Sequence, residues 1–566
     1  MRNDRLNEFE KNLIFIVGRD KVLTDSNKTS FYTTGIRVGI GTACAVIFPK
    51  NLLQLWQILK ICIAFDKVII IQAANTGLTG GSTPDGDNYD RDVVIINTLH
   101  LNQLVLLNCG SQVLAFPGTT LYQLEEKLLP IGRGPHSVIG SSCIGASVVG
   151  GVCNNSGGNL VNRGPAYTEL SLFARVNSKG ELELVNHLDI DLGNSPEEIL
   201  TNLESVDFKS DDLPESSYLA SDSEYQKRVR DVNSATPARF NADKRRLYES
   251  SGCAGKVAVF AVRLDTFPLP KKEQVYFLGT NNPQNLSTLR EKILLDFDYL
   301  PDMGEYMHRS YFDGAEKYCK DTLLIIKYFG TKFLPTLLFL KRKIDQYATE
   351  IPFLPKHFSD KFLQFIASFI PFHLPQSIKK YRNLYEHYMI ILASDNSIDL
   401  VGNLLQSEVS GKEEFEYMTC TESDGRDLLL HRYVAGSAPV RYRIMNSNNS
   451  GELLPLDVAL PRNCTNWHQL LTPDILSEMA ASFQMGHFLC MVFHWDFILK
   501  KGVNPNLIKD KILKLLDESN AKYPAEHNVG HLYQAESCLE NFYRKLDPTN
   551  SFNSGIGKSS KNKHYK

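Results

Sequence analysis

The apolar residues of the first 130 positions recur at helical spacing in some stretches and in short runs in others. Phe9, Leu13, Ile16 and Val17 predict an amphipathic helix followed by a turn within residues 1–35. Beyond them, short apolar runs predict strands at 45–48, 68–72, 92–97 and 112–116, and helical spacing predicts helices at 52–65 and 119–129. Strands that alternate with helices at these intervals are typical of an α/β unit.

The same alternation returns later in the chain. Strands are expected at 256–264 and 274–279, with a helix after Leu286, and a second α/β section begins after Tyr388. Between these parts, an acidic, Ser-rich stretch at about 204–224 is predicted to be a surface insertion. We therefore predict the α+β fold class, with α/β lobes.

Composition narrows the range of functions. The chain has 566 residues, 43% of them hydrophobic, and a formal net charge of −3, which argues against nucleic acid as a partner. The 11 cysteines form no Cys-x-x-Cys pair, and the first 20 residues lack the pattern of a secretory signal, so free thiols in a reducing compartment are expected. No apolar stretch reaches the roughly 18 residues of a transmembrane helix.

Two glycine-rich segments carry the first chemical signal. One is Gln72-Ala-Ala-Asn-Thr-Gly-Leu-Thr-Gly-Gly-Ser-Thr-Pro84, directly after a strand, and the other spans residues 135–158. Glycines let backbone N–H groups approach an anion, and small hydroxyl side chains add donors, so such loops can hold a pyrophosphate. Neither loop fits Gly-x-Gly-x-x-Gly or a triphosphate-binding loop. A tight turn packed on a helix explains one loop as well, but explains two long ones poorly.

These loops resemble the FAD loops of the vanillyl-alcohol-oxidase-type flavoproteins, and most closely those of the bacterial quinone-dependent D-lactate dehydrogenases. The resemblance continues through Arg163-Gly-Pro-Ala-Tyr-Thr168, Glu249–Gly255, Gly304–Arg309, Pro524–His531 and Asp547–Asn550, almost the whole chain. It implies an FAD-binding domain of this type, an α/β substrate cap domain and a helical membrane-binding insertion.

The resemblance also implies domain boundaries. It places an N-terminal helical segment at 1–35, the FAD domain at 36–270, the two parts of the cap domain at 271–330 and 388–520, the membrane-binding segment at 331–387, and a return to the FAD domain with a basic tail at 521–566.

By position, the resemblance assigns FAD contacts to both glycine loops and to one later strand. FAD is expected to be bound noncovalently, although His136 lies near the second loop and some relatives attach the flavin through a histidine. The implied FAD-binding residues are Ala73, Ala74, Asn75, Thr76, Gly77, Gly81, Ser82, Gly140, Ser147, Gly157 and Val259.

A histidine-rich segment near the C-terminus supplies candidate catalytic groups. Oxidation of a 2-hydroxy acid requires a base for the hydroxyl proton, and histidine titrates near neutrality. His487 and His494 stand seven apart and Glu526-His527 follows, as in the related D-2-hydroxyglutarate dehydrogenases. There, two histidines and a glutamate hold a divalent metal and the last histidine is the base.

Carried over, His527 is the predicted general base, and His487, His494 and Glu526 are possible metal ligands. The relatives place Gly-Asp-Gly-Asn between their histidines, where this chain has Phe488–Phe493, which puts the divalent metal in doubt. The alternative is that His487 and His494 are core histidines on an apolar strand.

A substrate carboxylate favours a bidentate arginine. Arg432, in Leu429-Leu-His-Arg-Tyr433, matches a carboxylate-binding arginine of relatives, and Arg441 and Arg443 are nearby alternatives.

Residues 331–387 differ from the rest of the chain in charge. They contain nine Lys or Arg against four Asp or Glu, a net charge of +5, together with many aromatics. Cations contribute about 1 kcal/mol each near an anionic leaflet, and aromatic rings insert at headgroup level, so the segment favours peripheral binding to an anionic phospholipid surface. A lid or a dimer contact is the rival interpretation.

Together these features predict FAD-dependent oxidation of D-lactate to pyruvate, with electrons passed to a membrane quinone of the respiratory chain. The predicted location is peripheral, on the cytoplasmic face of the bacterial inner membrane. The alternatives are an FAD-dependent dehydrogenase or oxidase of another D-2-hydroxy acid, and a membrane-associated protein that has lost its flavin.

Overall fold

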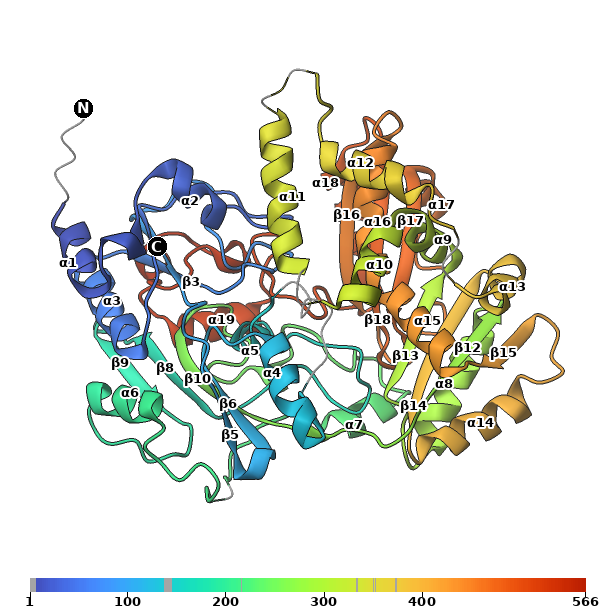
Figure 1. Cartoon of the computed structure of the whole chain (residues 1–566), viewed down its shortest axis with the longest axis horizontal. Helices are drawn as coiled ribbons and strands as arrows, with labels where there is room; N and C mark the ends of the chain where they lie inside the picture. Colours follow the sequence, from blue (N-terminus) through green and yellow to red (C-terminus); the bar gives the residue numbers. More distant parts are fainter. Residues whose placement is uncertain are drawn as a thin grey trace.

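The computed structural model describes residues 7–136, 145–214, 216–331, 334–349, 351, 353–371 and 374–566. Two lobes lie side by side, each built on β-sheets (Figure 1). The first lobe combines the N-terminal half with the last part of the chain, and the second lobe is formed by the residues between them. The predicted α+β class is confirmed.

The first lobe begins with a four-stranded sheet in the order β1-β2-β4-β3, in which β2, β4 and β3 are parallel. Helices α1 and α3 bury Leu13, Trp56 and Leu59 against it. Residues 45–72 and 92–97 form the predicted elements within one or two positions. The elements are α1 Glu8–Val17, β1 Val22–Leu23, α2 Ser26–Thr33, β2 Ala45–Ile47, α3 Leu52–Ala64, β3 Val68–Gln72 and β4 Val93–Asn97.

A five-stranded antiparallel sheet follows, in the order β5-β6-β10-β8-β9. Three of its strands, β5, β8 and β9, lie outside the predicted ones. Helix α4 begins at Leu121 rather than 119 because Thr120 caps its N-terminus. The elements are β5 Leu104–Leu107, β6 Gln112–Ala115, α4 Leu121–Leu128, β7 Arg133–Gly134, α5 Val148–Cys153, β8 Ser171–Val176, β9 Leu182–Asn186, α6 Pro196–Ser205, α7 Tyr225–Arg230, β10 Ala258–Asp265 and β11 Phe267–Pro268.

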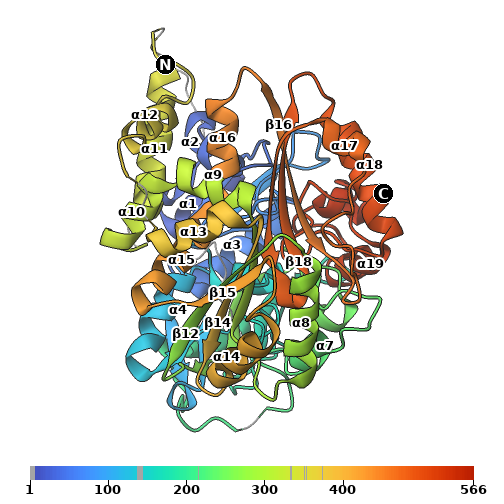
Figure 2. The same ribbon diagram turned by 90° about the vertical axis from the view of Figure 1, so that its right-hand side faces the viewer.

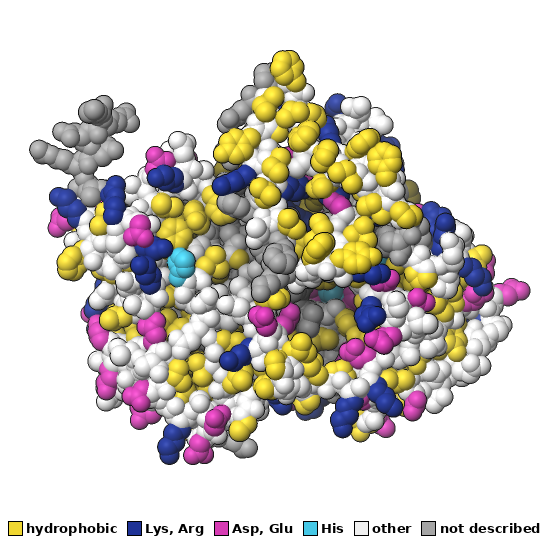
Figure 3. All heavy atoms as spheres, in the orientation of Figure 1, with side chains coloured by type: hydrophobic (Ala, Val, Ile, Leu, Met, Phe, Trp, Pro, Cys, Tyr) yellow, Lys and Arg dark blue, Asp and Glu magenta, His cyan; other side chains and the backbone are white. Residues whose placement is uncertain are grey.

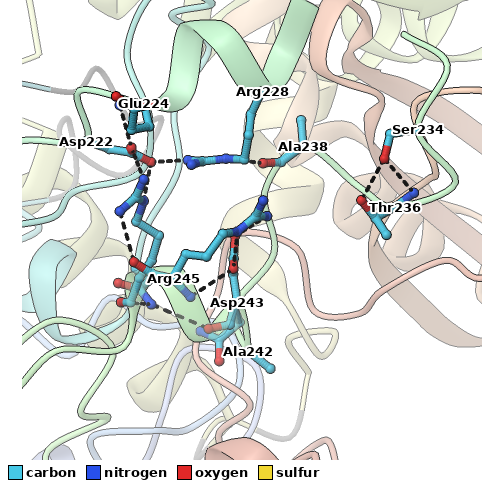
Figure 4. A network of polar contacts seen from close by, with 12 residues as sticks. Asp222, Glu224, Arg228, Ser234, Thr236, Ala238, Ala242, Asp243 and Arg245 are labelled. Atoms are coloured by element: carbon cyan, nitrogen blue, oxygen red, sulfur yellow. Dashed lines mark hydrogen bonds and ion pairs between the residues drawn. The ribbon is translucent and has the colours of Figure 1, made fainter. Parts of the chain in front are cut away.

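The acidic stretch at 204–224 was predicted to lie on the surface, and for Asp222 this is wrong. The Asp222 side chain is fully buried, and its carboxylate pairs with Arg228 (Figure 4) and also with Arg246. A carboxylate can be buried here because two guanidinium groups neutralise it. Asp222 thereby fixes the loop that leads into α7 against Gly164.

The second lobe is a seven-stranded antiparallel sheet in the order β15-β12-β14-β13-β17-β18-β16. Its strands are β12 Glu273–Thr280, β13 Met303–His308, β14 His387–Ser394, β15 Phe415–Thr419, β16 Ser450–Ala459, β17 Met479–His487 and β18 Val492–Lys500. Side chains alternate between the two faces of a strand, so each strand contributes to two separate cores.

One face of this sheet packs against α8, α14 and α18, and the other against α9, α13 and α15. Figure 2 shows α10–α12 on the opposite side of the lobe from α17 and α18. The helices are α8 Gln284–Asp296, α9 Arg309–Tyr318, α10 Lys320–Phe329, α11 Leu334–Thr349, α12 Phe358–Ala367, α13 Gln376–Leu384, α14 Ser397–Glu408, α15 Glu422–Val434, α16 Ala438–Met445, α17 Pro473–Ser477 and α18 Pro505–Glu518.

The chain then returns to the first lobe. Phe552 bridges to Ile69 of β3, and Asn553 donates hydrogen bonds to the carbonyl oxygens of Gly81 and Ala254. Helix α19, Ser537–Leu546, packs in the same region (Figure 1). The domain boundaries given above stay a prediction.

Within the described residues, no helix is both long and apolar enough to cross a bilayer. The described cysteines are all free thiols.

Candidate active site

A cavity of about 1670 Å³ lies between the two lobes. One wall, here called the loop wall, comes from the glycine loops of the first lobe. The opposite wall, the sheet wall, comes from the end of the large sheet, with residues 526–528 beside it.

Ten of the predicted FAD residues lie on the loop wall: Ala73, Ala74, Asn75, Thr76, Gly77, Gly81, Ser82, Ser147, Gly157 and Val259. Gly140 lies outside the described residues. Asn75 adopts a left-handed conformation, and its side chain donates to the Thr34 carbonyl and accepts from the Ser82 hydroxyl. Around Gly77, a Cβ would meet no atom within 4 Å. This open, small-residue surface leaves room for a flat cofactor to approach the backbone.

The sheet wall gathers ionisable side chains on one face of neighbouring strands. Glu305 on β13 stands opposite His487 on β17, and Asp457 on β16 stands opposite His494 on β18. The Glu305 carboxylate contacts His487 Nδ1 at 2.7 Å and Arg432 Nη2 at 2.6 Å. Asp457 lies 3.3 Å from His494 Nδ1.

The other ring nitrogens of the two histidines converge on Glu526. His487 Nε2 lies 3.3 Å from His494 Nε2 and 3.4 Å from Glu526 Oε2, and His494 Nε2 lies 3.8 Å from the same oxygen. Both Nδ1 atoms face carboxylates, which is the usual outer-sphere arrangement of metal-binding histidines. The donor set His487, His494 and Glu526 therefore fits a divalent metal.

The predicted alternative, that His487 and His494 are core histidines on an apolar strand, describes their position only in part. Both lie on strands with buried apolar neighbours, yet both line the cavity and contact carboxylates.

Charges in this cluster are compensated pairwise. Burial alone raises the pKa of Glu526, but Arg239 and His487 outweigh it and hold that pKa below its ordinary range. Burial lowers the pKa of His487, whereas Glu305 and Glu526 raise it to about 10. Burial raises the pKa of Asp457, but His527 and His494 face its carboxylate and lower that pKa by more, so it lies below its ordinary value.

His527 lies beside this cluster and lines the cavity. Its Nε2 is 3.9 Å from Asp457 Oδ2, which also accepts the Glu526 N–H at 2.7 Å. The side chain is 34% exposed and so accessible to a substrate in the cavity.

Arg432 lines the same cavity from α15, and among the described residues its buried Nε has no hydrogen-bond partner. Arg441 also lines the cavity but pairs with Asp321 and Asp360, and Arg443 pairs with Glu452.

Glu305, Asp457, Arg239 and Asp496 were not predicted. Asp496 accepts a hydrogen bond from Tyr311 at 2.6 Å and lies 3.8 Å from Arg37 of the first lobe. An acidic residue within an otherwise apolar strand, such as Asp457 between Leu456 and Val458, was the available signal.

Comparison with known proteins decides the family. The chain is 52% identical over 550 residues to the quinone-dependent D-lactate dehydrogenase of Haemophilus influenzae, covering 97% of this chain and 98% of that protein. It is 51% identical over 557 residues to the quinone-dependent D-lactate dehydrogenase of Escherichia coli, covering 98% of this chain and 97% of that protein. The chain belongs to the quinone-dependent D-lactate dehydrogenase family.

Two family models match this dehydrogenase chain. The model described as FAD binding domain matches residues 43–183, and the model described as D-lactate dehydrogenase, membrane binding matches residues 275–565. The predicted FAD cofactor and the predicted family are therefore confirmed. The membrane-binding match covers all but the first two residues of the large sheet and is much wider than the predicted segment at 331–387.

Solved structures share the fold of this dehydrogenase chain at low identity. p-Cresol methylhydroxylase with substrate bound has a TM-score of 0.58 at 12% identity, covering 97% of this chain and 96% of that chain. The 4-ethylphenol oxidase of Gulosibacter chungangensis has a TM-score of 0.58 at 11% identity, covering 98% of both chains.

Proposed function

We propose that this chain oxidises D-lactate to pyruvate and passes the two electrons to a membrane quinone. The observation that carries the proposal is the single cavity in which the predicted FAD wall faces His527, Arg432 and the histidine–carboxylate cluster. The remaining alternative keeps the same chemistry with another D-2-hydroxy acid.

FAD bound on the loop wall would supply a two-electron acceptor for the α-hydrogen of the substrate. His527, reachable from the cavity, takes the hydroxyl proton as general base. Asp457 lies near enough to stabilise the imidazolium that forms. The proton is therefore held at His527 Nε2 or passed on to solvent.

Arg432 binds the substrate carboxylate. Glu305 holds one side of its guanidinium at 2.6 Å, and the Arg432 side chain lines the cavity. A fixed guanidinium orients a carboxylate with two hydrogen bonds and so selects the hydrogen that faces the cofactor.

If a divalent metal is held by His487, His494 and Glu526, it would polarise the substrate oxygens. Loading the purified protein with Mn²⁺ or Zn²⁺ and counting bound ions, with a His494→Ala variant as comparison, tests this part of the proposal. Equal loading of both proteins would contradict it.

The visible spectrum of the purified protein tests the main proposal. Bands of an oxidised flavin that bleach on anaerobic addition of D-lactate, and not of L-lactate, are expected. Bands that persist with D-lactate but bleach with another D-2-hydroxy acid would favour the alternative.

His527→Ala should leave the flavin bound and slow this bleaching by about 10²- to 10⁴-fold, the usual contribution of a positioned base. His100→Ala, at an exposed position outside the cavity, is the matched control. Unimpaired bleaching of the His527 variant would remove its role.

We also propose that the second lobe docks on an anionic phospholipid surface at the cytoplasmic face of the inner membrane. Large apolar side chains gather over α11 and α12 (Figure 3), and Phe353, Phe365 and Phe369 are 92%, 63% and 74% exposed. Lys356 and Lys361 lie in the same region.

Sedimentation with anionic vesicles, weakened by salt and absent with neutral vesicles, is the expected result. Equal binding to both vesicle types would contradict an electrostatic contribution. Protease accessibility in inverted and right-side-out membrane vesicles tests which face is used.

A further inference from the structure

The cavity encloses about 1670 Å³, and its lining includes more residues than those of the loop wall and the sheet wall. It continues past the sheet wall to a part lined by α10, α11, α12, α15 and α16. We call this part the outer chamber.

The walls of the outer chamber are mainly apolar and reach the outside of the molecule. Six apolar side chains line the outer chamber: Ile326, Leu340, Ile344, Phe362, Leu430 and Val440. Leu340, Ile344 and Phe362 line the chamber and are also 52%, 41% and 51% exposed. The chamber therefore adjoins the apolar surface over α11 and α12 in Figure 3.

A small group of charged side chains lies within this apolar lining. Lys341 Nζ contacts Asp360 Oδ1 at 2.6 Å, and Arg441 lies 3.5 Å from the same oxygen and 2.6 Å from Asp321. Asp360 and Arg441 are buried, at 6% and 8% exposure. We call Asp321, Lys341, Asp360 and Arg441 the charged cluster.

The charged cluster can bind a neutral acceptor. Its two cations are matched by two carboxylates, so it carries no excess positive charge to attract a phosphate. Lys341 has three N–H donors and only one of them is needed by Asp360. A spare donor inside an apolar chamber suits a carbonyl oxygen.

We propose that the outer chamber is the binding site of the quinone, with a ring carbonyl at Lys341 and the isoprenoid tail along the apolar walls toward the surface over α11 and α12. This inference rests on the proposed function, in which a quinone is the acceptor. D-Lactate loses two electrons and two protons to become pyruvate, and the quinone gains two electrons and two protons to become the hydroquinone. Asp360 and Lys341 lie where a proton is needed at the quinone oxygen.

Photolabelling tests the location without relying on activity. The full-length protein with its flavin is irradiated with a quinone that carries an azide on the ring, and labelled peptides are identified by mass spectrometry. Label in α10, α11, α12, α15 or α16 that unmodified quinone displaces is expected. Label elsewhere, or label that phosphatidylglycerol displaces as well as quinone does, would overturn the proposal, the second outcome indicating a site for acyl chains.

A pair of substitutions tests the two parts of the site. Ile344→Trp narrows the chamber from a partly exposed position, and Lys341→Met removes the donor. Each substitution should raise the KM for quinone about tenfold or more. This is the decrease in affinity expected when one hydrogen bond from a charged donor, or a comparable apolar contact, is lost. Leu507→Trp and Lys514→Met, both at exposed positions on α18 outside the cavity, are the matched controls.

Flavin bleaching by D-lactate in the absence of quinone separates the two levels of failure. If the parent protein does not bleach, the proposed function fails. If all the variants bleach normally and keep the parent KM for quinone, the outer chamber is not the quinone site and only this inference fails.

Discussion

Two buried histidines, one at the start of the second glycine loop and one on the sheet wall, have pKa values that are shifted in opposite directions. His136, at the start of the second glycine loop, is 5% exposed, and its Nδ1 has no hydrogen-bond partner among the described residues. Burial, with a smaller contribution from Arg163, lowers its pKa to about 4. His487 is buried between Glu305 and Glu526, which raise its pKa to about 10.

The difference shows how each wall is built. Burial of His136 disfavours its charged form and lowers its pKa. On the sheet wall, the carboxylates of Glu305 and Glu526 face His487 and raise its pKa instead. The first wall suits a large cofactor held by many weak contacts, and the second suits proton transfer and charge stabilisation.

The largest expected effect concerns Arg239, which joins the two walls. Its guanidinium donates to the Gly158 carbonyl of the loop wall and to the Glu526 carboxylate. Arg239→Met removes the nearest cation of the buried Glu526 carboxylate and should lower the free energy of unfolding by about 3–5 kcal/mol. Urea unfolding measures this.

Two controls accompany that measurement. Lys227→Met removes one half of an exposed ion pair with Glu224 and should cost less than about 1 kcal/mol. The double variant Arg239→Met with Glu526→Met should be more stable than Arg239→Met alone. If Arg239→Met costs no more than Lys227→Met, the two walls are not joined by this pair.

Next in size is the acid sensitivity that His136 contributes. The folded protein keeps His136 neutral down to about pH 4, whereas the unfolded chain takes up the proton near pH 6.5. The unfolded state therefore binds more protons between pH 6.5 and pH 4, and stability falls as the pH is lowered through this window. At about 1.4 kcal/mol for each pH step, the cost approaches about 3 kcal/mol. His136→Asn should make the urea midpoint depend less on pH. If the midpoints of the variant and of the parent protein fall equally between pH 6.5 and pH 4, His136 does not cause the acid sensitivity.

Glu305→Gln tests the sheet wall by changing one carboxylate that holds both His487 and Arg432. Loss of such a supporting contact usually costs about 10- to 100-fold in activity or metal affinity. Bleaching of the flavin by D-lactate should slow by that factor while FAD remains bound. Glu273→Gln, at an exposed end of β12 in the same sheet, is the control. If flavin bleaching slows equally in Glu305→Gln and Glu273→Gln, the effect comes from loss of any carboxylate of this sheet and not from the contacts of Glu305.

The smallest effect is expected for one added methyl group on the loop wall. Around Gly77, a Cβ meets no protein atom, so Gly77→Ala should fold normally and weaken FAD binding by up to about tenfold. At Gly157, a Cβ collides with the Glu526 carboxylate, so Gly157→Ala should disturb flavin binding and bleaching together. The affinity for FAD, from titration of the flavin-free proteins, and the melting temperature are measured for both variants. Equal FAD affinities and equal melting temperatures of Gly77→Ala and Gly157→Ala would contradict the expected difference.

The loop wall was predictable from sequence because its residues form short contiguous motifs whose spacing reflects the backbone. Ala73–Gly77 and Ser147 were assigned through the resemblance to the FAD loops of known flavoproteins, which such contiguous motifs make easy to see. The sheet wall was predictable only in its histidines and in Glu526, which lie near one another in sequence.

Glu305, Asp457 and Arg239 escaped prediction because they come from three distant segments and meet only when the strands pair. The available signal, an acidic residue within an otherwise apolar strand such as Asp457, does not show which distant residue it will meet. Strands β5, β8 and β9 were missed for a related reason, since the pairing of short strands depends on neighbours far away in the chain.

The return of the chain to the first lobe bears on the order in which the protein can be made. Ile69 and Gly81 are synthesised early, yet Phe552 and Asn553, which complete their hydrogen bonding, come almost 500 positions later. Since chains are synthesised at about 5–20 residues per second, the last contacts of the loop wall are made roughly half a minute or more after its glycine loops. Until then the nascent chain exposes an unfinished cofactor site, so flavin insertion should follow synthesis of Phe552 and Asn553 rather than synthesis of the glycine loops.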